Sequence, residues 1–194
     1  MKGKDQEAPK AEAADGFEAA CDDALHSLRE VVESDWSVPA GTLEWSCRQT
    51  VVHMIDCVFS YGLQLAARAQ GGFLPFEELH ALPEATTGDL LEGLRGIGAI
   101  FTALIRSVPG ESVASDGLFS LDVDEWAARG AYEILLHTYD VLQGHGVSFG
   151  PPAALCSWVL ASPRLWMLDR NLAAETSDPW EALLLGSGRP WRPR

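Results

Sequence analysis

The segment Ala131–Asp140, AYEILLHTYD, places three ionisable side chains in an otherwise apolar stretch of sequence. Glu133 and His137 are four residues apart, and Asp140 follows three residues later. On an α-helix this spacing places all three side chains on one face. They form either a solvated group on the helix surface or an inward-facing group that meets a side chain from another helix.

The rest of the chain predicts an all-α fold. Apolar residues recur at helical spacing over four long segments, at about 17–34, 46–69, 87–107 and 123–143. Four such helices, with no internal repeat, predict a four-helix bundle, and a short strand is expected near 113–119. We expect the core of the bundle to include seven apolar residues: Val51, Ile55, Leu94, Ile97, Phe101, Leu104 and Leu136.

The chain divides into three regions. Residues 1–15 are polar and rich in Ala, Lys and Glu, which predicts a disordered lead-in. The bundle is expected over 16–146, with Ser46 and Gln49 forming a capping box at the start of its second helix. Residues 147–194 form a C-terminal extension, expected to be helical at about 153–160 and 164–173 and to continue from Ser177 as an arm packed on the bundle.

The composition restricts the class of protein. Hydrophobic residues make up 47% of the 194 residues and charged residues 22%, an ordinary globular balance. The net charge of −14 argues against a nucleic-acid-binding protein, because phosphate contacts require clustered Lys and Arg. No membrane partner is expected, because no apolar run reaches the length needed to span a bilayer. We therefore expect a small-molecule partner, and a monomer or homodimer.

Two features predict a cytoplasmic location. The N-terminal sequence lacks the apolar core of a signal peptide. The cysteines are widely scattered and include no CxxC pair, which is typical of reduced thiols in a reducing compartment. They are Cys21, Cys47, Cys57 and Cys156.

A possible partner for the Ala131–Asp140 segment is His53, which lies in the apolar stretch of the second predicted helix. Helix bundles commonly build metal sites from side chains on facing helices. His53, Glu133 and His137 would form a set of two His and one carboxylate, which suits Zn²⁺, Fe²⁺ or Ni²⁺ and leaves coordination positions open. Alternatively, His53 is a hydrogen-bonded core residue, and Glu133 and His137 form an exposed pair.

Three further residues are candidates for supporting roles. Asp140 would orient the imidazole of a metal-bound His137, or else lie on the helix surface. Arg129 would pair with Glu133, meet an anionic substrate, or be solvated. Cys57 is one helical turn from His53 and would be a fourth ligand, a nucleophile or a packing residue.

Aromatic residues and the remaining histidines supply weaker candidates. His26 could line a pocket, whereas His80 and His145 lie in turns and are expected to face solvent. Four tryptophans in the C-terminal region would cap the bundle or form the wall of a ligand pocket. They are Trp158, Trp166, Trp180 and Trp191.

The pairing of LEWSCRQTVVHMIDCV with RGAYEILLHTYDVLQGHG resembles the DinB-like superfamily, and within it the N-terminal domain of the mycothiol-dependent maleylpyruvate isomerases. The residues that match the family pattern run from Trp45-Ser46 to His53, and from Arg129 through Glu133 and His137 to Asp140. The resemblance covers roughly 16–146. It implies a metal, typically zinc, held by His53, Glu133 and His137.

The sequence also departs from that family. Tyr132 stands where the family often has His, although this position is not one of the three ligands. The isomerases carry a C-terminal α/β domain, and the roughly 48 residues after Gly146 are too few for it.

The function expected from these features is that of a metal-dependent thiol S-transferase or isomerase. It would use a low-molecular-weight thiol such as mycothiol or bacillithiol and act on a small electrophile, since an open metal position stabilises a thiolate. Two alternatives remain open. One is a thiol-independent biosynthetic enzyme, such as a lyase or cyclase, and the other is a non-catalytic small-molecule-binding protein.

Overall fold

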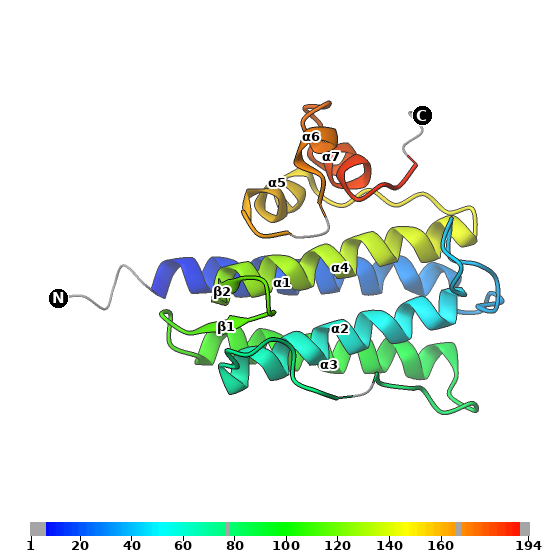
Figure 1. Ribbon diagram of the computed structural model, residues 1–194. Coiled ribbons are helices and arrows are strands. Elements are labelled where there is room, and N and C mark those ends of the chain that lie inside the picture. Colours follow the sequence, from blue (N-terminus) through cyan, green and yellow to red (C-terminus); the bar gives the residue numbers. More distant parts are fainter. Residues whose placement is uncertain (1–6, 77, 166–167, 191–194) are drawn as a thin grey trace.

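The computed structural model describes residues 7–76, 78–165 and 168–190, and it is mostly helical. The long helices are α1 (Glu7–Leu28), α2 (Cys47–Ala67), α3 (Thr87–Ser107) and α4 (Val123–Gly144). Both α1 and α2 pack against α3 and α4, so the four helices surround one core (Figure 1). The all-α prediction is confirmed.

The core contains the residues that the helical pattern selected. Four of the seven are buried, and Ile55, Ile97 and Leu104 are partly buried and packed against the same core. Between α1 and α3, the rings of Phe17 and Phe101 meet edge to face with centroids 4.9 Å apart. Gly130 of α4 lies directly beneath them, and a Cβ there would be 2.9 Å from Phe17 Cε2. The missing side chain therefore allows α4 to approach both rings.

Each of the last three long helices begins with a capping box. Ser46 and Gln49 form the predicted one at α2, and equivalent pairs begin α3 and α4. In each case the cap side chain accepts a hydrogen bond from a backbone N–H that has no partner within the helix, and such a cap stabilises by about 1 kcal/mol. These signals fix where the helices start.

The first helix differs from the prediction at both ends. It begins at Glu7, so the expected disordered lead-in is wrong for residues 7–15, while residues 1–6 lie outside the described part. Alanine has the highest helix propensity, and Ala13 and Ala14 are buried in the core, so this segment has both a local and a tertiary reason to be helical. The helix ends at Leu28 and is followed by a 3₁₀ turn, η1 (Arg29–Val31).

A β-hairpin connects α3 to α4. Strand β1 (Val113–Ser115) lies where a short strand was predicted, and it pairs antiparallel with β2 (Ser120–Asp122), which was not. The Asp116 carboxylate accepts hydrogen bonds from the backbone N–H groups of Leu118 and Phe119, at 2.8 and 2.7 Å, and so closes the turn.

The C-terminal extension contains α5 (Ala153–Ala161), α6 (Arg170–Ala173) and α7 (Pro179–Gly186). Figure 1 shows it above the layer formed by α1 and α4, with α2 and α3 on the opposite side of that layer. The helical prediction is confirmed for 153–160, but within 164–173 the described helix covers four residues. The arm expected from Ser177 is partly wrong, because α7 forms there. Asp178 caps α7 and Pro179 occupies its first turn, a helix-start signal that the sequence carries.

The prediction that no apolar run is long enough to span a bilayer is wrong for α2, whose length and composition are sufficient for a membrane span. In this structure, one face of α2 packs into the core through Val51, Met54, Val58 and Leu65. Core helices of soluble proteins satisfy the same criterion, so it does not decide the location of the protein.

Candidate metal centre

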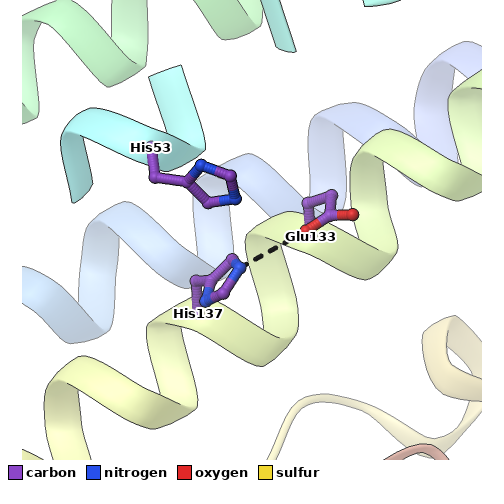
Figure 2. Close-up of side chains that lie close together, drawn as sticks. All are labelled: His53, Glu133 and His137. Atoms are coloured by element: carbon purple, nitrogen blue, oxygen red, sulfur yellow. Dashed lines mark ion pairs between the residues drawn. The ribbon is translucent and has the colours of Figure 1, made fainter. Parts of the chain in front are cut away.

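Helices α2 and α4 bring His53, Glu133 and His137 together, as the sequence pattern predicted. One potential ligand atom from each residue lies within 4.8 Å of those of the other two. Figure 2 shows the His53 ring extending from α2 toward the pair on α4, where His137 Nε2 lies 3.4 Å from Glu133 Oε2. The imidazole rings of His53 and His137 are nearly perpendicular, with centroids 5.1 Å apart. The alternative of an exposed helix-surface pair is therefore wrong.

The donor set fits a divalent cation. Tetrahedral bonds of about 2.1 Å to zinc separate neighbouring ligand atoms by about 3.4 Å, which is the separation between Glu133 and His137 in this structure. His53 completes a group within 4.8 Å, so small side-chain movements would place all three donors on one ion. Two imidazoles and a carboxylate leave one tetrahedral position for water or substrate. The cluster could hold a metal ion.

Asp140 fixes the orientation of His137. Its Oδ2 lies 3.0 Å from His137 Nδ1, while the opposite ring nitrogen faces Glu133. With Nδ1 donating to the carboxylate, the Nε2 lone pair is directed into the cluster, as metal-binding histidines require. Asp140 is buried, so its alternative role as a surface carboxylate is wrong.

Tyr61 is part of the cluster and was missed by the sequence analysis. Its hydroxyl donates a hydrogen bond of 3.1 Å to Glu133 Oε1, leaving Oε2 to face His137. The signal was present, because Tyr61 lies eight residues after His53, two turns along the same face of α2.

Cys57 lies between these two residues on α2, with its Sγ 3.3 Å from His53 Nε2. Burial raises the pKa of this thiol far above its usual value, and the nearby carboxylates of Glu133 and Asp56 raise it further. A thiol with such a pKa is protonated at neutral pH. This argues against Cys57 as a free nucleophile and favours a packing or hydrogen-bonding role.

The pKa values of the two histidines shift in opposite directions. Burial lowers the pKa of His137, but its hydrogen bonds to Asp140 and Glu133 outweigh burial, and the net pKa is raised. Burial lowers the pKa of His53, and the neighbouring His137 lowers it further. Burial raises the pKa of Glu133, yet the interactions with His137 leave its net pKa below the usual value. A cation would compete with a proton on His137, because ligation requires the Nε2 lone pair.

Arg129 does not join the cluster. Its side chain is 1% exposed. Its guanidinium donates a hydrogen bond of 2.8 Å to the Asp116 carboxylate and one of 3.0 Å to the carbonyl oxygen of Arg164. The expectation of a solvated Arg129 is wrong, and the expected pair with Glu133 is replaced by the pair with Asp116. Contact with an anionic substrate would require this buried pair to break.

Two cavities lie beside α2, next to the cluster. The larger, of about 420 Å³, is lined by His53 and Trp45 together with Arg48, Gln49 and His80. The smaller, of about 220 Å³, is lined by Cys57, Tyr61 and several aromatic rings: Phe59, Phe73 and Phe76. The half-exposed Trp45 ring lies 4.7 Å from that of His53, between centroids. A small molecule in the larger cavity would thus contact a residue of the cluster.

Among the described residues, the other histidines and the C-terminal tryptophans are not part of the cluster. His26 is exposed on α1, His80 is exposed as expected, and His145 is partly buried rather than solvent-facing. Trp180 packs edge to face on Tyr139 of α4, and Trp158 covers Gly16 of α1, which supports the capping role. Trp166 and Trp191 fall outside the described residues.

No family model matches the chain, and no match is found among curated proteins or solved structures. The resemblance to the DinB-like proteins therefore stays an interpretation of the two sequence motifs.

Proposed function

We propose that this protein is a metal-dependent enzyme built on a DinB-like four-helix bundle, acting as a thiol S-transferase or isomerase on a small electrophilic molecule. The observation that carries the proposal is the convergence of His53, Glu133 and His137 from two facing helices. Asp140 and Tyr61 support it, because each holds one ligand side chain in place through a hydrogen bond. Metal-ligating histidines almost always donate their other ring N–H to a carboxylate, a backbone carbonyl or water, and His137 has such a partner in Asp140.

Zinc is the metal we propose, with nickel and iron as the other candidates for two imidazoles and one carboxylate. When bound, the metal supplies Lewis acidity that stabilises a thiolate or a hydroxide at neutral pH. The chain itself supplies orientation: Asp140 directs the His137 lone pair into the cluster, and Tyr61 restrains Glu133. Trp45 and the larger cavity supply a binding surface for the small molecule.

The thiol that we propose as cosubstrate is of the mycothiol or bacillithiol type, in line with the resemblance described above. The chain's own nearby thiol, Cys57, is a poor substitute because its raised pKa keeps it protonated. All four cysteines are free, which accords with the reducing, cytoplasmic setting that we propose. We propose no nucleic-acid or membrane partner, and a monomer or homodimer as the working form.

The first test is metal content. Protein purified without an affinity tag should contain close to one divalent ion per chain by elemental analysis. His137→Ala and Glu133→Gln should lose it, while His26→Ala, which changes an exposed histidine elsewhere, should retain it. Retention of the metal by the His137 variant would show that the ion is bound somewhere else.

The second test is thiol consumption. Mycothiol, bacillithiol and glutathione are each assayed with an epoxide, a haloalkane and an unsaturated acid. Turnover should require the metal and disappear in His137→Ala, while Cys57→Ala should keep at least part of it. If metal-loaded protein is inert with all three thiols but binds or converts a small molecule, the binding protein or the thiol-independent lyase or cyclase replaces the transferase.

A further inference from the structure

The C-terminal extension reaches the metal centre through Arg189. Its guanidinium forms a two-point contact with Asp140, from Nε to Oδ1 at 2.8 Å and from a terminal nitrogen to Oδ2 at 2.6 Å. The Asp140 side chain is 2% exposed and that of Arg189 is 13% exposed, so solvent weakens this contact little. Arginine from outside the four long helices thus pairs with the carboxylate that orients His137.

One oxygen atom joins the extension to the cluster. Asp140 Oδ2 accepts from Arg189 and also lies 3.0 Å from His137 Nδ1, and His137 Nε2 in turn faces Glu133 at 3.4 Å. Planar, two-point binding by the guanidinium fixes the plane of the carboxylate. Without it, Asp140 could rotate about its side-chain bonds, and the imidazole would lose the partner that sets its direction.

The backbone around Arg189 is shaped to deliver this side chain. The N–H of Arg189 donates to Leu184 O at 2.9 Å, and the N–H of Gly188 donates to Leu185 O at 3.0 Å. With Gly188 at a φ of 75°, these two bonds form a Schellman motif that ends α7 and reverses the chain. The next residue, Pro190, is also held against α4, because the Tyr139 hydroxyl donates a hydrogen bond of 2.8 Å to its carbonyl oxygen.

We propose that Arg189 is a positioning residue of the metal centre, and that metal binding and docking of the segment 187–190 onto α4 are energetically coupled. The proposal rests on the proposed metal binding. Removing the direct hydrogen-bonding partner of a metal ligand typically weakens metal affinity about 10–100-fold. Arg189 contacts that partner, Asp140, and not the ligand, so this range is an upper bound for its removal. By linkage, metal must then favour docking of the segment by the same factor that docking favours metal binding.

The test measures Zn²⁺ affinity by competition with a chromogenic chelator. We expect Arg189→Gln to bind Zn²⁺ up to about 10-fold more weakly than the unaltered chain, which is at the lower end of the loss that removal of a ligand's direct partner causes. Arg189→Lys should recover part of the affinity, since it restores the charge but not the two-point contact. A matched control is Arg170→Gln, because Arg170 bonds to Leu160 O and Ser162 O within the extension and should leave the Zn²⁺ affinity unchanged.

A second measurement needs no variant. Exchange of the amide hydrogens of residues 187–189 in the unaltered chain should slow when Zn²⁺ is added, while exchange in the β1–β2 hairpin should not change; Pro190 has no amide hydrogen. Equal Zn²⁺ affinity of Arg189→Gln and the unaltered chain overturns the positioning role, and unchanged exchange of the amides of 187–189 overturns the coupling. If the unaltered chain binds no Zn²⁺ at all, it is the proposed metal function that fails.

Discussion

Breaking the buried ion pair of Arg129 and Asp116 should lower the free energy of unfolding strongly. We consider Arg129→Met, which keeps the side-chain volume but removes the charge and leaves the carboxylate, 4% exposed, without its cation. Removing one partner of a buried ion pair typically costs about 3–5 kcal/mol. For a chain of this size, each kcal/mol lowers the unfolding midpoint by about 2–4 °C, so the midpoint should fall by about 6–20 °C.

A double-mutant cycle tests whether the pair is the reason. Asp116→Asn alone should also be strongly destabilising, because it strands the guanidinium of Arg129. The double variant should lose less than the sum of the two single losses, by about 1–3 kcal/mol, because neither charge is left unpaired. Thermal and urea unfolding, followed by circular dichroism, supply the free energies.

The control is the exposed pair of Arg95 and Glu92, where both side chains are more than half exposed. Arg95→Met should leave the unfolding midpoint unchanged, because solvent screens such a pair. Strictly additive losses in the Arg129 and Asp116 cycle would refute the reasoning. If the double variant is stable and binds metal but has lost turnover, Arg129 contacts an anionic substrate.

Three further outcomes are expected. Hydrogen bonds outweigh burial and lower the pKa of Asp116 in the folded protein. The stability that Asp116 contributes is therefore present above its unfolded pKa of about 3.9 and is lost as pH falls through the lower folded pKa. The difference in unfolding midpoint between the unaltered chain and Asp116→Asn should shrink below pH 4. Gly144→Ala should lower the thermal unfolding midpoint, because the added Cβ would collide with the Pro39 carbonyl oxygen. Gly150→Ala should leave the midpoint unchanged, because open space surrounds that position. Chelation of the metal should lower the unfolding midpoint of the metal-loaded protein, since a ligand at 100 times its Kd stabilises by about 2.7 kcal/mol; an unchanged midpoint would argue against metal binding to the native state.

The sequence predicts the long helices well because their signals are local. Periodic apolar residues and capping pairs such as Ser46 with Gln49 depend on neighbours within a turn or two. The convergence of His53 with Glu133 and His137 was one of the interpretations that the residues allowed, and the family resemblance favoured it over a core His53 and an exposed pair.

Partners chosen by tertiary structure were not predictable in this way. Arg129 binds Asp116 across a hairpin whose second strand gave no clear signal. Arg189 reaches Asp140 from 49 residues away, and no spacing rule connects them. The start of α1 was not predicted, because the polar composition of residues 7–15 does not show that Ala13 and Ala14 pack in the core.

Helix α4 has covered surfaces on nearly every side, because α1 lies beside it, α2 contacts it on one side and the extension on the other (Figure 1). Of its 22 residues, 17 are buried, whereas a helix at the surface of a globular protein usually keeps a polar stripe in water. Random substitutions should therefore be tolerated least along this helix. In a library of variants selected for folding, the sequence of α4 should change most slowly, and α3, in which seven of 21 residues are buried, should vary most freely among the long helices.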